Sequence, residues 1–378
     1  IIFKMKKTLL FFTAIINFIG FSFFVNAADV TINGSNSTDY TFDAGNTLTL
    51  KGPANASGKL NFNSGSISIS STDNGDQITG EVNTVSGTDI RIIASSDNTL
   101  TISATIGGAG SINKDGEGIL ILNQSNDYTG TTTISDGTLR LNASGTLSDS
   151  TAVNVSSKGT FDVNPTNTIA SIEGSGIIDI ARSTTLTAGD ANDKEFSGVI
   201  QGAGNFSKSG SGTLTLSGTN TYTGSTTINA GTISVASSTN LGADPGSADA
   251  DNIIFAGGEL EYTGSDTQTI VANKGVTISS DSTLNVSNSS GELRFAGSIS
   301  GTANLTKTGA GTIRFNNSSN SFTGALIINQ GEARLTQGAS DAYNFDVTVQ
   351  NNANLVINDA SFNTNNTITV ESGGAVNL

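Results

Sequence analysis

Apolar side chains recur at every second position in short runs along most of the chain. Leu120/Leu122 and Leu214/Leu216 are examples, and this spacing places both side chains on one face of a β-strand. Beyond residue 27, no stretch repeats apolar residues at i, i+3, i+4 and i+7, the periodicity of an amphipathic helix. The pattern therefore predicts an all-β chain of short strands.

Three segments align almost residue for residue, over about 105–141, 199–235 and 298–335. They read GILILNQSNDYTGTTTISDGTLRL from 118, GTLTLSGTNTYTGSTTINAGTISV from 212 and GTIRFNNSSNSFTGALIINQGEARL from 311. In each segment an apolar pair leads into a polar stretch, a Tyr-Thr-Gly or Phe-Thr-Gly turn, an isoleucine strand, a second Gly turn and a last short strand. Such repeats predict one structural unit used several times.

Short strands with frequent turns are compatible with a sandwich, a barrel or a solenoid. The chain is too long for one sandwich, no linker divides it, and the repeats are collinear. We therefore expect a right-handed parallel β-helix of on the order of 15 coils, at roughly 20–25 residues per coil. Its inward Leu, Ile, Val and Phe side chains stack into one continuous core.

Composition removes several classes of function. The chain has no His, Cys or Trp, and its 17 basic and 32 acidic residues give a net charge of −15. The lack of His and Cys excludes a Ser-His-Asp triad, a thiol nucleophile, a zinc-thiolate site and disulfides. An acidic chain with scattered bases also lacks the footprint of a nucleic-acid-binding protein.

The N-terminus has the pattern of an export signal. Met5 is the only Met, so residues 1–4 are expected to precede the true start; two lysines and the apolar run 8–25 follow it. The small residues at positions 25 and 27 predict cleavage after Ala27, making 1–27 a signal peptide and 28–378 the mature chain. The alternative is a membrane anchor, which we disfavour because polar and small residues interrupt the run.

At the repeats the sequence resembles the passenger of a type V secreted protein, an autotransporter. The segments G-x-G-T-L-x-L, N-x-Y-T-G-x-T-x-I and N-A-G-T-L resemble the passenger-associated transport repeat, most closely at 204–235. The resemblance implies a β-helical passenger, displayed on a Gram-negative cell through a C-terminal outer-membrane translocator barrel. No such barrel follows the repeats in this sequence, so we expect the chain to be a fragment or a truncated reading frame.

Candidate catalytic and metal-binding residues are few, and we expect none to act. Asp190, Asp193 and Glu195 form the densest acidic cluster, whose oxygen atoms suit Ca²⁺. Without the spacing of a known calcium loop, a solvated loop is the favoured interpretation. The acids at positions 244, 249 and 251 are interpreted in the same way.

Two further repeated positions carry a chemical alternative. Lys114, Lys208 and Lys307 each open a K-x-G-x-G frame, which resembles a phosphate loop, but the Lys precedes the glycines and no helix follows. We expect these lysines at exposed coil corners. The recurrent Tyr128, Tyr222 and Phe322 could stack on sugars, but aromatic side chains of this size more often cap a core.

These observations favour a surface-displayed or secreted adhesive rod that is not an enzyme. The alternatives are a polysaccharide-active enzyme built on a β-helix and a rod that self-associates. We expect no cofactor, and we expect a host-surface protein or a second copy of the chain as the partner. A net charge of −18 over residues 28–378, from 14 bases and 32 acids, disfavours anionic membranes and glycans.

Overall fold

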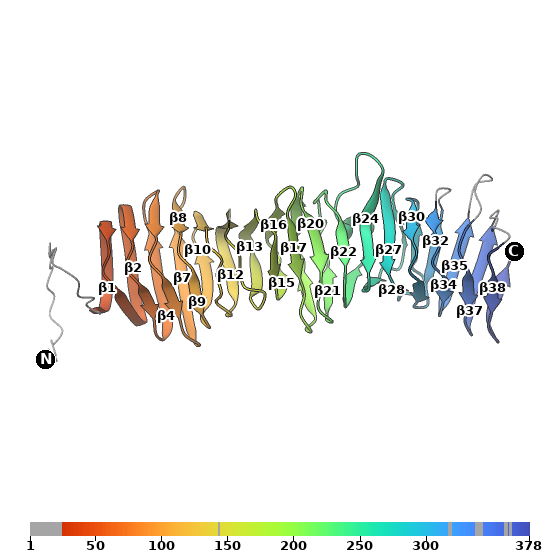
Figure 1. The fold of residues 1–378 in the computed structure, drawn as a ribbon, viewed down its shortest axis with the longest axis horizontal. Helices are drawn as coiled ribbons and strands as arrows, with labels where there is room; N and C mark the ends of the chain where they lie inside the picture. Colours follow the sequence, from red (N-terminus) through yellow and green to blue (C-terminus); the bar gives the residue numbers. More distant parts are fainter. Residues whose placement is uncertain (1–24, 143, 317–319, 337–342, 359–361, 363–364) are drawn as a thin grey trace.

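The protein forms an elongated parallel β-solenoid of about 16 turns, here called coils. The structure is a computed structural model that describes residues 25–142, 144–316, 320–336, 343–358, 362 and 365–378. The chain runs from one end of the rod to the other without doubling back (Figure 1). The prediction of an all-β parallel solenoid is thus confirmed.

The strands fall into three sheets, all of whose strand pairs are parallel. The 25-stranded sheet contains β1 (Val25–Asn36), β2 (Tyr40–Ala56), β3 (Leu60–Phe62), β4 (Gly65–Ser71), β5 (Asp76–Ile78), β6 (Val82–Thr84), β7 (Thr88–Ala94), β8 (Thr99–Ile102), β9 (Ile106–Gly108), β10 (Ser111–Asp115), β11 (Ile119–Leu122), β12 (Thr132–Leu141), β13 (Ala152–Val163), β15 (Ser171–Gly174), β16 (Ile177–Ile180), β18 (Lys194–Phe196), β19 (Val199–Gly202), β21 (Thr213–Leu216), β23 (Thr232–Val235), β25 (Glu259–Tyr262), β28 (Ser282–Val286), β31 (Leu305–Thr308), β34 (Leu326–Ile328), β36 (Val347–Val349) and β38 (Ile368–Val370). The eight-stranded sheet contains β14 (Asn167–Ile169), β17 (Thr185–Ala188), β20 (Asn205–Lys208), β22 (Thr226–Ile228), β24 (Asp249–Ala256), β27 (Lys274–Ser280), β30 (Ile299–Gly301) and β33 (Ser321–Phe322). The six-stranded sheet contains β26 (Thr267–Ile270), β29 (Glu292–Phe295), β32 (Thr312–Phe315), β35 (Gly331–Thr336), β37 (Ala353–Asn358) and β39 (Ala375–Asn377).

A strand can continue around a corner of its coil where a glycine occupies the bend. Strand β2 pairs with β3, β4 and β5 in succession, so this one strand follows three faces of the rod. Its two bends coincide with Gly45 and Gly52, whose φ angles are 83° and 62°. Glycine adopts this left-handed conformation without the steric penalty that a Cβ would bring.

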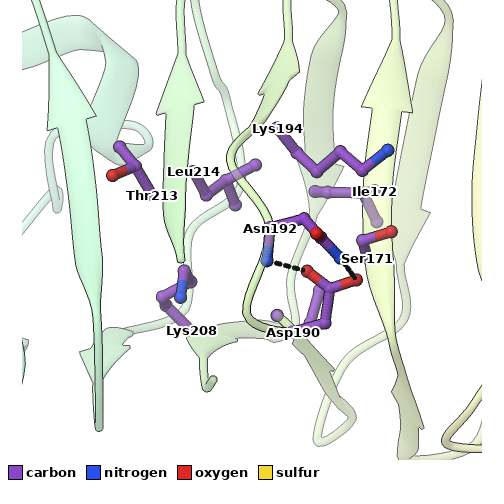
Figure 2. Close-up of a pocket in the computed structure, with 10 residues that line it drawn as sticks. Ser171, Ile172, Asp190, Asn192, Lys194, Lys208, Thr213 and Leu214 are labelled. Atoms are coloured by element: carbon purple, nitrogen blue, oxygen red, sulfur yellow. Dashed lines mark hydrogen bonds between the residues drawn. The ribbon is translucent and has the colours of Figure 1, made fainter. Parts of the chain in front are cut away.

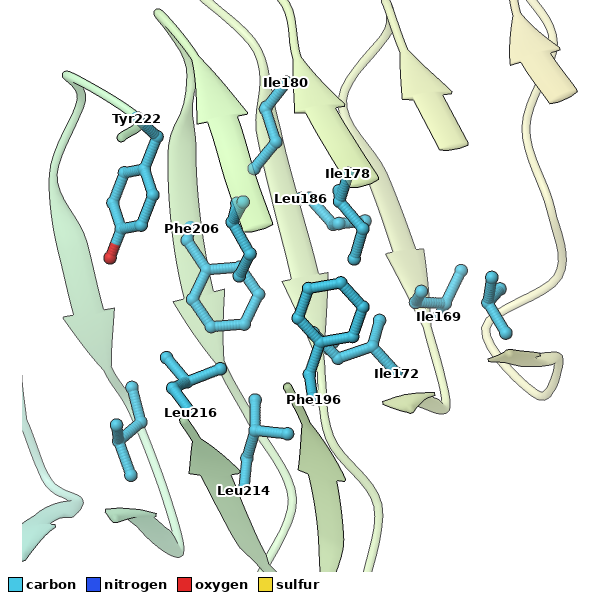
Figure 3. Close-up of a cluster of buried hydrophobic side chains, with 14 of the residues drawn as sticks. Ile169, Ile172, Ile178, Ile180, Leu186, Phe196, Phe206, Leu214, Leu216 and Tyr222 are labelled. Atoms are coloured by element: carbon cyan, nitrogen blue, oxygen red, sulfur yellow. The ribbon is translucent and has the colours of Figure 1, made fainter. Parts of the chain in front are cut away.

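The core is a continuous stack of the predicted inward side chains. Leu120 pairs in register with Leu100 of the preceding coil and Leu139 of the next, and all three are fully buried. Leu214 and Leu216 point inward as predicted (Figure 3), whereas Thr215 between them is partly exposed. Stacking coils therefore removes the apolar face of each coil from water.

One connection departs from the plain coil. Between β23 and β24 lies the 3₁₀ helix η1 (Ser238–Leu241), whose first turn is capped by the side chain of Ser237. No described residue belongs to a helix that is long and apolar enough to cross a membrane. The predicted signal peptide lies outside the described residues up to position 24, and the cleavage predicted after Ala27 falls within β1.

Candidate functional site

The repeated lysine is the largest departure from the sequence prediction, because it is buried rather than exposed. Lys208 ends β20, where strand alternation turns its side chain inward with Phe206. Its Nζ donates to the carbonyl oxygens of Ser209, Gly210 and Ala230 at 2.5, 2.9 and 3.3 Å. The first two acceptors belong to its own turn, and the third lies in the following coil.

The same arrangement recurs in the other two repeats. The Nζ of Lys114 donates to Asp115, Gly116 and Asp136, and that of Lys307 donates to Thr308, Gly309 and Gln330. Both lysines are fully buried. Each lysine thus fastens its turn to the turn one coil later, and we call these three side chains the lysine pegs.

The chemistry of the lysine pegs is structural. A lysine ammonium has three N–H donors, and each peg directs all three at backbone carbonyls. Burial lowers the pKa of Lys114 and of Lys307 to about 8, because a dehydrated charge is disfavoured. The pegs therefore stabilise turns and leave no donor for a phosphate.

The recurrent aromatic position is also part of the core, as predicted. Tyr128 and Tyr222 are fully buried, and each hydroxyl lies 2.5 Å from a threonine hydroxyl four residues later. In the third repeat Phe322 occupies the position and Leu326 replaces the threonine. The hydrogen-bonded pair is thus replaced as a unit by an apolar pair, which is the behaviour of a core contact.

A buried asparagine two residues before that aromatic ring satisfies the backbone of the coil before it. The Oδ1 atoms of Asn126 and Asn220 accept from the backbone N–H groups of Ile106 and Ile200 at 3.0 and 2.8 Å. This role was not deduced from the sequence, although the N-x-Y-T-G pattern carries it. An unpaired buried amide would cost about 1–3 kcal/mol, so these asparagines have a structural purpose.

The acidic cluster is divided among separate partners. Asp190 accepts from the backbone and side-chain nitrogens of Asn192 at 2.8 and 3.0 Å (Figure 2). Burial raises the pKa of the Asp190 carboxyl, but the hydrogen bonds from Asn192 outweigh it and leave the pKa below its usual value. Asp193 accepts from the Thr213 backbone at 2.8 Å, and Glu195 accepts from a serine hydroxyl.

A small pocket adjoins this cluster without gathering its carboxylates. Asp190, Lys194 and Lys208 are among the residues that line it, whereas Asp193 and Glu195 are not (Figure 2). Among the residues that the structure describes, no group of three or more His, Cys, Asp or Glu side chains is placed to hold a metal ion. The pocket thus combines opposite charges and does not bring together the two carboxylates that glycoside hydrolysis requires.

The second set of acids is dispersed as well. Asp244 lies 3.7 Å from the Nζ of the buried Lys274, which donates to the Leu241 and Gly242 carbonyls at the end of η1. The Asp249 carboxylate accepts from the backbone N–H of Asp251, and the Asp251 carboxylate accepts from the Thr277 hydroxyl. Among the three, Asp244 therefore helps Lys274 to hold the β23–β24 connection in place.

Comparison with known proteins supports the resemblance drawn from the motifs. A family model described as the passenger-associated-transport-repeat matches residues 112–141, 206–235 and 305–332, and each match contains one lysine peg. The chain is 32% identical over 252 residues to "Adhesin BmaC autotransporter" of Brucella suis biovar 1 (strain 1330). That match covers 62% of this chain and 7% of the relative. The predicted resemblance to an autotransporter passenger is confirmed.

Proposed function

We propose that the chain is the adhesive rod of an autotransporter, displayed on a Gram-negative cell with an outer-membrane translocator as its partner. One observation carries the proposal: three passenger-associated-transport repeats are embedded in a single continuous solenoid. The relative that shares 32% identity bears the name of an adhesin. The signal peptide predicted at 1–27 belongs to the same proposal, since a passenger must first be exported.

The geometry supports binding rather than turnover. The inward positions of the coils are filled by core side chains, and among the described residues the carboxylates near the pocket are engaged separately. What the rod offers a partner is its outward strand faces, which carry Thr, Asn, Ser and charged side chains. Contacts distributed along such faces suit attachment to a surface.

The test is cell attachment to beads coated with the purified protein. Beads coated with albumin and beads coated with the same protein after denaturation in urea serve as controls, because the second control retains the composition while disrupting the solenoid. A panel of polysaccharides and peptides is incubated with the same protein to detect cleavage.

Attachment above both controls, without product release, is the expected result. Product release that disappears on substituting Asp190, Asp193 or Glu195 would overturn the proposal in favour of an enzyme. Failure of the native protein to attach to any cell type tested would also overturn it, since the rod would then be a passive spacer.

A further inference from the structure

Three arginines are stacked in register on one outward face of the rod. Strands β29, β32 and β35 pair so that Arg294 lies opposite Arg314, and Arg314 lies opposite Arg334. The flanking residues of these strands, such as Leu293 and Phe295, are buried, so alternation directs the arginines outward. We call these three side chains the arginine ladder; it contains half of the six arginines of the chain.

The ladder is only partly neutralised. Like charges directly opposite each other on neighbouring strands are destabilising, and two glutamates offset this. The Nε atoms of Arg294 and Arg314 both donate to Oε1 of Glu292, at 2.6 and 2.7 Å, while Arg334 pairs with Glu332. Burial raises the pKa of Glu292, but the two guanidinium groups outweigh it and lower the pKa, so the carboxylate is ionised at neutral pH.

The guanidinium groups of the ladder have donors that no described residue engages. A guanidinium has five N–H donors, and among the described residues only the Nε of each ladder arginine has a hydrogen-bond partner. The ladder side chains are 19–37% exposed. The three partly exposed guanidinium groups therefore present further donors at the outer face, at the strand spacing of about 4.8 Å.

The surroundings of the ladder are mostly polar and include the two glutamates. In the same outward row, Thr269 precedes Arg294 and Val356 follows Arg334. In the adjacent outward row, Thr267, Glu292 and Thr312 follow one another in register. The face thus alternates cationic donors with hydroxyl groups and carboxylate acceptors.

We propose that the arginine ladder binds a linear acidic polysaccharide, with its anionic groups against successive guanidinium edges and its hydroxyls against the neighbouring Thr and Glu side chains. Planar guanidinium groups bind carboxylate and sulfate through paired hydrogen bonds. The proposal names a ligand class for the adhesive rod and rests on the proposed function to that extent. It also revises the expectation drawn from net charge alone, which disfavoured anionic glycans.

Two other occupants fit less well. An acidic peptide offers carboxylates but few hydroxyl donors. Glu292 and Glu332 would therefore repel its charges without gaining the hydrogen bonds that a polysaccharide supplies. A second copy of the chain would need an acidic row in successive coils, and the outward Asp162 and Asp179 are already bonded to Arg140 and Gln201. The net charge of −15 opposes the approach of any polyanion, but this repulsion is screened beyond about 8 Å at physiological salt.

The experiment measures binding of polygalacturonate and heparin to the full protein by isothermal titration calorimetry, with neutral dextran and polyglutamate in parallel. The variants are Arg314→Gln and the triple Arg-to-Gln variant of the ladder. Arg182→Gln is the matched control, because Arg182 lies exposed in a turn and its substitution changes the net charge equally. Far-UV circular dichroism establishes that each variant is folded.

We expect at least one of the two acidic polysaccharides to bind, about tenfold weaker binding for Arg314→Gln, no detectable binding for the triple variant and less than twofold change for Arg182→Gln. Binding of neither polysaccharide, equal losses for Arg314→Gln and Arg182→Gln, or tighter binding of polyglutamate would overturn the proposal. Cells that attach equally to native and triple-variant beads would show that the adhesive contact lies elsewhere, which overturns the ladder but not the adhesin. Polysaccharide binding without cell attachment would support the ladder as a binding site and overturn the proposed adhesive function.

Discussion

Replacing Lys208 with methionine tests whether a lysine peg stabilises its coil. Methionine keeps an unbranched stem, so packing between the register partners Ala188 and Ile228 is retained. The change removes three donors from the carbonyl oxygens of Ser209, Gly210 and Ala230. The perturbation is therefore confined to the ammonium group and its acceptors.

The magnitude follows from two opposing terms. Each of the three buried carbonyl oxygens left without a donor costs about 1–3 kcal/mol, and removing the dehydrated ammonium, whose burial lowers the pKa of Lys208, returns only part of this cost. We expect Lys208→Met to lower the free energy of unfolding of this region by about 2–4 kcal/mol. Lys194→Met is the control, because Lys194 is partly exposed and its ion pair with Glu173 is of a kind that contributes at most about 1 kcal/mol.

The assay is hydrogen exchange followed by mass spectrometry, since solenoids unfold by parts and one global transition is not guaranteed. Amides of residues 205–235 should exchange faster in Lys208→Met, with distant coils unchanged. Urea denaturation followed by far-UV circular dichroism gives the overall effect. If these amides exchange no faster in Lys208→Met than in Lys194→Met, then dehydration of the ammonium cancels its hydrogen bonds and the reasoning is refuted.

Two further predictions concern the core and the pH dependence of stability. Leu214→Asp buries a charge in an apolar stack and should lower the free energy of unfolding, measured by urea denaturation, by several kcal/mol. Thr215→Asp, opposite the exposed Glu195, should lower it by about 1 kcal/mol or less; equal effects would mean the strand register is wrong. Stability should rise between pH 8 and about 10, because burial lowers the pKa of Lys307 to about 8 from 10.5, and the unfolded chain then holds a proton that the folded chain has lost. Above pH 10 it should fall, because burial raises the pKa of Tyr222 and the unfolded chain ionises first. Urea midpoints from pH 7 to 11 measure both limbs. Stability that stays flat between pH 8 and 10 would show that the carbonyl acceptors hold the lysine proton at least as firmly as water does.

The fold was predictable because a solenoid repeats one local rule. Alternation of apolar residues gave the inward positions of Leu214 and Leu216, and the aromatic ring at Tyr222 was placed correctly in the core. The same rule applied to charged residues would have placed Lys208 correctly, since it lies two positions after the inward Phe206. The expectation of an exposed lysine was wrong because a general preference for solvated charges outweighed the local alternation.

The outward faces were harder to predict than the core. Glu292 and Glu332 each lie two residues before an arginine of the ladder, but only the register of the strands shows that Glu292 also meets Arg314 of the next coil. The spacing of Arg294, Arg314 and Arg334, at intervals of 20 residues, was the available signal. Such a signal becomes meaningful only once the length of the local coil is known, because coil length varies along this chain.

The reach of each lysine peg into the following coil has a mechanical consequence. The two ends of the described chain lie at opposite ends of the rod (Figure 1), so a force that separates them peels terminal coils one at a time. Lys208 and its acceptor Ala230 are 22 residues apart, and releasing that loop lengthens the chain by about 70 Å at full extension. An anchored rod under flow would thus lengthen in discrete steps, and the coils that carry a lysine peg would unfold last. This stepwise unfolding would absorb part of the applied force before the attachment breaks.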